Sequence, residues 1–179
     1  MERVLRAHPD CTLIGSYQGQ FSVQSGEEAG QSMLAQHGSA LPDAVVCGND
    51  QMAIGVLQAL TAAGIRVPWD MALVGFDDIY PGGLSEPPLT TVHQPMRLLG
   101  ERACIRLLDR IARPGLRRQV EVLPTELVLR SSCGCPPGTV TREPVQRVRG
   151  GKLSSRAEPA LAGAPSGLPR PRPSRARKS

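Results

Sequence analysis

Short apolar runs alternate along the chain with longer stretches in which apolar residues recur at helical spacing. Residues 12–16, 44–47 and 71–76 are such runs, each followed by polar or glycine residues. This pattern is typical of strands that are buried on both faces of a parallel sheet. Residues 89–93 form a further short extended run. These segments predict the strands of one sheet.

Helical periodicity fills the stretches between the runs. Ser25 begins a capping-box pattern, which predicts a helix that ends at Gly38. Apolar residues on one face predict a second helix over residues 50–63 and a third, longer one over residues 95–113. The chain therefore alternates between predicted strands and predicted helices.

This alternation predicts an α/β fold with a parallel, Rossmann-like sheet and flanking helices, because such sequences form right-handed βαβ units. Two closing strands are predicted over residues 119–123 and 126–130. In parallel sheets, ligands bind beyond the carboxyl ends of the strands. The residues that follow the predicted strands are therefore the candidates for ligand binding.

Three side chains occupy such positions: Phe21, Asn49 and Asp77 follow the first, second and third predicted strands. We expect them to converge on one crevice that suits a polyhydroxylated ligand. An amide donates to and accepts from hydroxyls, a carboxylate is a strong acceptor, and an aromatic ring packs on a sugar or a base. Each has a structural alternative: Asn49 as a helix cap, Asp77 as a turn residue, and Phe21 as a core residue.

Four segments of the chain resemble the LacI/GalR family of bacterial transcription regulators. Their sequences GNDQMAIG, GIRVPWD, VGFDD and PPLTTV are similar to the family's AND-x-M-A-x-G, G-x-x-V-P-x-D, VGFDD and PPLTTV segments, and they begin at residues 48, 64, 74 and 87. Together they cover about residues 20–130, and the combination is more specific than any one of them.

The resemblance implies a two-lobed, periplasmic-binding-protein-like fold that closes on a small-molecule effector, either a sugar or a purine-like compound. It implies that Asn49 and Asp77 contact this effector and that Phe21 stacks on it. The intact regulator would be a cytoplasmic homodimer in which the effector changes the affinity for operator DNA. We expect no cofactor, no bound metal and no catalytic residue.

The resemblance also predicts a domain organisation. Residues 1–94 would belong to the C-terminal lobe of the sensor domain, residues 95–123 would cross into the first lobe, and residues 124–138 would return. We expect the helix-turn-helix and most of the first lobe, with its ligand-binding arginine, to be absent from this chain. Operator DNA would be bound only through that absent N-terminal domain.

The net charge of +5 is unevenly distributed. Residues 139–179 contain ten of the 21 lysines and arginines but only two of the 16 acids, so residues 1–138 carry a net charge of −3. The basic segment is rich in arginine, proline and serine and has no apolar period, which predicts a disordered tail. Because the part expected to fold is acidic, its charge does not indicate nucleic-acid binding.

The five cysteines are scattered and odd in number, so they do not indicate a disulfide framework. Cys133 and Cys135 lack the second pair that a zinc site of this kind requires. The alternatives are a local disulfide and two free thiols in a reducing compartment, with free thiols favoured.

Other functional classes find little support. The chain has no G-x-G-x-x-G segment, P-loop or nucleophile elbow, so we expect no enzyme. No apolar run approaches the roughly 20 residues of a membrane helix. The alternative function is the sugar-binding protein of a transporter, which shares the fold. Two features argue against this alternative: the PPLTTV segment, and N-terminal residues that lack the apolar region of a secretory signal.

Overall fold

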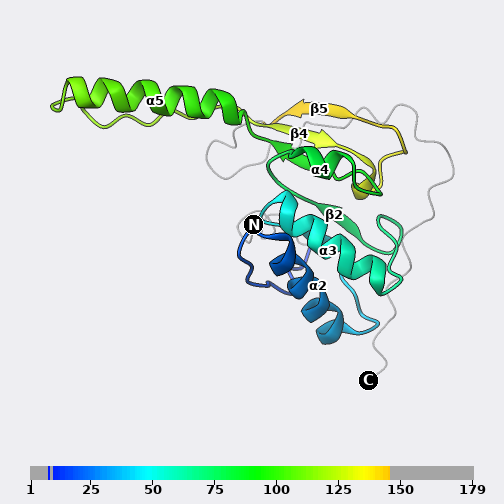
Figure 1. Ribbon diagram of the computed structural model, residues 1–179. Helices are drawn as coiled ribbons and strands as arrows, with labels where there is room; N and C mark the ends of the chain where they lie inside the picture. Colours follow the sequence, from blue (N-terminus) through cyan, green and yellow to red (C-terminus); the bar gives the residue numbers. More distant parts are fainter. Residues whose placement is uncertain (1–7, 9, 146–179) are drawn as a thin grey trace. The chain divides into compact units, whose positions relative to one another are not determined.

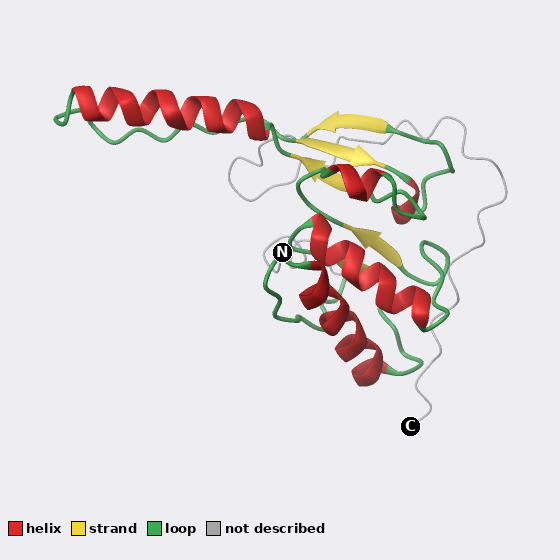
Figure 2. Ribbon diagram, in the orientation of Figure 1, coloured by secondary structure: helices red, strands yellow, loops and turns green. Residues whose placement is uncertain are grey.

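The computed structural model describes residue 8 and residues 10–145, so residues 146–179 of the expected disordered tail lie outside the described residues. Figure 1 shows the order of the elements, and Figure 2 distinguishes helices from strands. The helices are α2 (Val23–His37), α3 (Asp50–Ala62), α4 (Tyr80–Gly83), α5 (Met96–Ala112) and the short 3-10 helix η1 (Ser131–Cys133). The strands are β1 (Ala44–Val46), β2 (Ala72–Val74), β3 (Thr91–His93), β4 (Glu126–Leu129) and β5 (Thr141–Pro144).

The predicted parallel sheet is formed only in part, because one of its predicted strands, residues 89–93, belongs mainly to a second, antiparallel sheet. β1 pairs with β2 in parallel, with Ala44 opposite Ala72 and Val46 opposite Val74. A parallel bridge from Val74 to Thr90 continues the pairing to the segment that leads into β3. The predicted strands at 44–47, 71–76 and 89–93 are thus confirmed, each in a shorter form. β3, β4 and β5 form a separate antiparallel sheet in that order.

Two predicted strands are not formed. Residues 12–16 and 119–123 are irregular, although both have apolar residues in the expected pattern. Their apolar side chains have no surface to pack on: Val120 is 86% exposed and Ile14 is 47% exposed. An apolar pattern predicts a strand only where a neighbouring element covers one of its faces.

The prediction of disorder is wrong for the first residues of the basic segment. Residues 141–144 form β5, which pairs along its whole length with β4. All four residues are exposed, so the strand is held by the backbone ladder rather than by burial of apolar side chains. A sequence without an apolar pattern gives no signal for such an edge strand.

α2 and α3 pack closely and carry most of the apolar core (Figure 2). α2 begins three residues earlier than predicted, because Ser22 is its N-cap and forms the capping box with Ser25. The helix stops at Gly38, as predicted. Gly26 and Gly55 allow the two backbones to approach, since a Cβ on either would collide with the main chain of the other helix. The buried core comprises Met33, Cys47, Met52, Ala53, Val56, Leu57, Leu60, Val67, Met71, Leu73 and Leu89.

α5 differs from the other helices because none of its residues is buried. The chain runs back along the helix after residue 113 (Figure 1). Polar contacts hold this return segment, since Arg106 donates to Gln119 and, at 3.2 Å, to Glu121. Within the described residues, no helix is long and apolar enough to cross a membrane.

Candidate functional site

The carboxyl ends of β1 and β2 lie side by side and carry two of the three candidate residues. The amide of Asp50 donates to the carbonyl of Phe76 at 2.8 Å, just beyond the paired strands. Asn49 therefore follows β1, and Asp77 follows β2, at the same edge of the sheet. This arrangement is the one that the alternation of strands and helices predicted.

The structure brings Phe21 and Asn49 together. The Asn49 Nδ2 atom donates to the carbonyl of Phe21 at 3.2 Å, and Asn49 Oδ1 accepts from the amide of Met52 at 2.9 Å. Asn49 is thus the N-cap of α3, which is the structural role that the sequence left open for it. Both the nitrogen and the oxygen of its side-chain amide have a partner. The side chain of Phe21 is 65% exposed, so the core alternative for this residue is wrong.

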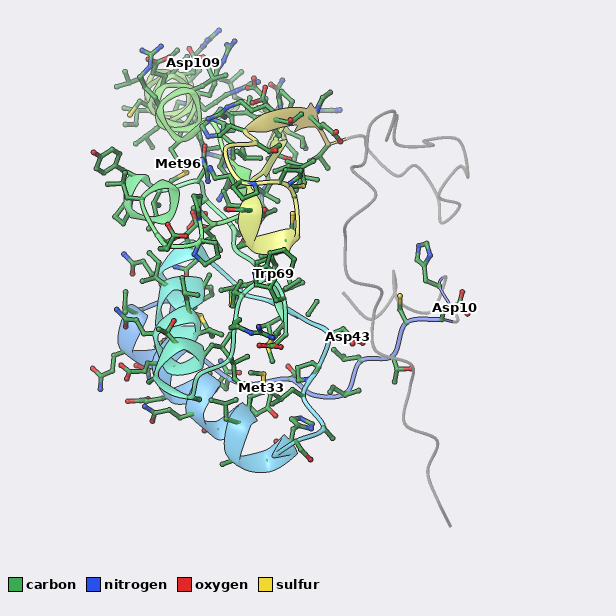
Figure 3. All side chains as sticks on the ribbon, turned by 90° about the vertical axis from the view of Figure 1, so that its right-hand side faces the viewer. Asp10, Met33, Asp43, Trp69, Met96 and Asp109 are labelled. Atoms are coloured by element: carbon green, nitrogen blue, oxygen red, sulfur yellow. The ribbon has the colours of Figure 1, made fainter. Side chains whose placement is uncertain are left out.

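Asp77 lines a pocket of about 460 Å³ that Phe21 and Asn49 do not line. The Asp77 Oδ1 atom accepts from Gln94 Nε2 at 2.6 Å. Met96, which Figure 3 labels at the start of α5, is another of the lining residues. Asp77 thus lines a different hollow from Phe21 and Asn49, and of the three candidates only Phe21 and Asn49 are hydrogen-bonded to each other. The convergence of all three on one ligand stays a prediction.

Backbone strain is concentrated at these positions. Among the described residues, the non-glycine residues with positive φ are Phe21 at 56°, Asp77 at 110° and Asp78 at 59°. L-residues rarely adopt such angles, and residues held in them cluster at ligand-binding sites. Two of the three candidates and the neighbour of one are therefore held in strained backbone conformations.

Asp50 is a residue that the sequence analysis did not single out. It is fully buried, and its two carboxylate oxygens accept from Thr91 Oγ1 at 2.6 Å and from the amide of Ile79 at 2.9 Å. Burial raises the pKa of this carboxyl, the two hydrogen bonds lower it, and the charges of Asp77 and Asp78 raise it further. Asp50 thus ties the start of α3 to the loop after β2 and to β3.

Asp78 is the second residue that was missed. Its side chain is only 7% exposed and forms ion pairs with Arg130 at 2.5 Å and with Arg142 at 3.0 Å. His93 Nδ1 lies 3.1 Å from the same carboxylate. Burial by itself would raise the pKa of Asp78, but the hydrogen bond and charge of Arg130, joined by Arg142, hold the pKa below its ordinary value of 3.8. Asp78 therefore fixes the loop that presents Asp77.

A second pocket, of about 1040 Å³, lies between residues 10–17 and the elements α2 and β1. It includes Cys47, whose pKa burial and the charge of Asp50 raise to about 12. That thiol is therefore protonated at neutral pH. No group of three or more metal-ligating side chains occurs in the part of the chain that the structure describes.

Comparison of the sequence with known proteins shows which family the chain belongs to. The periplasmic binding protein-like domain family matches residues 3–133. The HTH-type transcriptional repressor PurR of Pasteurella multocida is 39% identical over 131 residues, which are 73% of this chain and 37% of the repressor. The chain belongs to the LacI/GalR family.

Two solved structures of LacI/GalR regulators agree with the assignment. A lac repressor dimer bound to operator and the anti-inducer ONPF has 34% sequence identity and a TM-score of 0.63, over 71% of this chain and 38% of that chain. The regulator CelR in complex with cellobiose has 38% identity and a TM-score of 0.60, over 64% of this chain and 34% of that chain. The chain thus spans little more than a third of the relatives that it matches, and its fold is that of a periplasmic-binding-protein-like sensor.

Proposed function

We propose that this chain forms part of the effector-binding domain of a transcription regulator, and that Phe21, Asn49 and Asp77 contact the effector. The effector is a sugar or a purine-like compound. This choice is supported by the regulators to which the chain is similar, one of which, CelR, is bound to cellobiose in its solved structure. The complete regulator is a cytoplasmic homodimer that binds operator DNA through an N-terminal domain.

One observation carries the proposal. Asp77 follows β2 at the carboxyl edge of the paired strands, in a strained backbone conformation, and it lines a pocket. Gln94 donates to one oxygen, and within the described residues no donor reaches the other. A carboxylate that is oriented in this way is available to accept from a hydroxyl or an N–H group of a ligand.

The proposed domain organisation follows the same reasoning. Residues 1–94 and 124–138 belong to one lobe of the sensor, whose parallel strands are part of a Rossmann-like sheet, and residues 95–123 belong to the other lobe. The lack of any buried residue in α5 supports this division, because an amphipathic helix of 17 residues normally buries one face.

The test is a nuclear magnetic resonance titration of the ¹⁵N-labelled chain with cellobiose, ribose and hypoxanthine. One lobe supplies only part of the burial that holds a ligand, so we expect binding in the millimolar range. Amide shifts should centre on Asp77 and Gln94. Asp77→Ala should weaken binding by roughly 10- to 100-fold, because a hydrogen bond to a charged group contributes about 1.5–3 kcal/mol.

Asp109→Ala is the matched control, since it removes a carboxylate on α5 that is 46% exposed and pairs only with Arg113 among the described residues. It should leave the titration unchanged. Submicromolar binding would contradict the division between two lobes. Shifts that centre on residues 10–17, beside the larger pocket, would contradict the assignment of the site.

A further inference from the structure

Two cysteines lie in contact directly after β4. Cys133 is the last residue of η1, and its Sγ atom is 3.5 Å from the Sγ atom of Cys135. Gly134 links them with φ at 99°, a left-handed conformation that suits glycine. Both thiols are half-buried. The sequence Cys-Gly-Cys is thus folded so that the two sulfurs face each other.

The fold holds one side of this pair and leaves the other open. Ser132, next to Cys133, donates from its hydroxyl to the carbonyl of Leu73 at 2.6 Å and from its amide to the carbonyl of Pro88 at 3.0 Å. The amide of Gly134 donates to the carbonyl of Ser131 at 3.0 Å, but no described atom beyond its chain neighbours lies within 4 Å of the position that a Cβ would take. The pair therefore has an anchored neighbour in Ser132 on one side and open space at Gly134 on the other.

We propose that Cys133 and Cys135 are a redox-active dithiol that a small-molecule disulfide, such as oxidised glutathione, converts to an intramolecular disulfide. The Cys133 thiolate attacks one sulfur of the small disulfide and expels one thiolate, which leaves a mixed disulfide on Cys133. Cys135 then loses its proton, and its sulfur attacks Cys133 Sγ and expels the second small thiolate. The two protons that leave the cysteines end on the two small thiols, so two protein thiols are oxidised and one disulfide is reduced.

The anchoring of Ser132 beside Cys133 and the surroundings of Cys135 together support this order of attack. Burial, then the hydrogen bond and the charge of Cys133, raise the pKa of Cys135 to about 11. Cys135 therefore keeps its proton at neutral pH, which supports Cys133, the cysteine next to the anchored Ser132, as the thiol that reacts first with the external disulfide. Closure shortens the distance between the two sulfurs to about 2.05 Å. A ring this small is strained, so the step is reversible when reducing thiols are added.

The experiment treats the reduced 179-residue chain with oxidised glutathione at neutral pH, blocks the remaining thiols by alkylation and digests the protein with trypsin. Cleavage after Arg130 and Arg142 releases residues 131–142, which contain both cysteines. We expect this peptide to lose the mass of two hydrogens and to carry no glutathione. Cys11 and Cys104, which are exposed and unpaired among the described residues, should carry glutathione instead.

Two controls separate the fold from the local sequence. The free peptide of residues 131–142 has the same cysteines without the anchoring of Ser132, so the folded chain should close from the mixed disulfide at least about tenfold faster. Equal closure rates would overturn the proposal. Cys135→Ser should accumulate the glutathione adduct at Cys133, and Cys133→Ser should react more slowly. An adduct that forms equally fast in both variants would overturn the assigned order.

Discussion

The ion pair between Asp78 and Arg130 should be one of the strongest single contributions to the stability of the described structure. The carboxylate is 7% exposed and the guanidinium 11% exposed, and they are 2.5 Å apart. Arg130 also donates to the carbonyl of Leu89 at 2.7 Å. Asp78→Asn keeps the size of the side chain but leaves the buried cation without its counter-charge.

Removing one partner of a buried ion pair typically costs about 3–5 kcal/mol of unfolding free energy. The loss here should lie near the lower limit, about 3 kcal/mol, because Arg130 retains the carbonyl of Leu89. Arg142 adds less, since its side chain is 46% exposed and solvated ion pairs are worth about 0–1 kcal/mol. The pKa of Asp78 is lowered in the folded state. Its contribution is therefore complete above pH 3.8, the ordinary pKa, and is lost as the pH falls through the lowered value.

The assay is urea denaturation followed by circular dichroism, at neutral pH and again at the lowest pH at which the protein folds. Arg130→Met and the double variant complete a double-mutant cycle. The double variant should cost clearly less than the sum of the two single variants, and the cost of Asp78→Asn should shrink on acidification. Glu101→Gln is the control, because its pair with Arg97 on α5 is exposed and should contribute about 0.3–0.5 kcal/mol. Additive single effects, or a cost of Asp78→Asn no larger than that of Glu101→Gln, would refute this reasoning.

Three further predictions address helix packing, burial of charge and the basic segment. Gly55→Ala places a Cβ against the α2 backbone and should lower the unfolding free energy by about 1–3 kcal/mol, whereas Gly100→Ala, with nothing described within 4 Å, should raise it by about 0.5–1 kcal/mol; equal urea midpoints would contradict the helix contact. Because burial raises the pKa of Asp50, wild-type stability should fall as the pH rises from 3.8 through the raised value, and a denaturation series should show no such fall for Asp50→Asn. Because the lysines and arginines are concentrated near the end of the chain, filter binding should show a DNA affinity that drops steeply with salt and disappears when residues 146–179 are removed. Operator-specific binding by the shortened chain would contradict this prediction.

Local sequence signals sufficed for the elements in which several signals agree. α3 has a cap at Asn49, an apolar face and a glycine after its end, and the structure forms it from Asp50 to Ala62. β1 and β2 were predictable because they are apolar on both faces and followed by polar residues. The same reasoning identified the edge of the sheet at which Asn49 and Asp77 lie.

Contacts between distant parts of the sequence could not be read in this way. Asp78 was overlooked because its partners, Arg130 and Arg142, are 52 and 64 residues away along the chain. The strand predicted over residues 119–123 is not formed for a similar reason, because an apolar pattern does not show whether a neighbouring element is there to cover it. β5 is the opposite case: its sequence has no apolar pattern, yet it forms a strand because its backbone pairs with β4.

The central claim is that Asp77 holds the effector, and the response of the full-length regulator tests it most directly. Operator binding is measured by fluorescence anisotropy with and without the sugar or purine that binds the wild-type protein. The Asp77→Ala variant should bind the operator like the wild type but no longer change its affinity when the effector is added. A normal effector response from this variant, or the loss of operator binding in the absence of effector, would contradict the account.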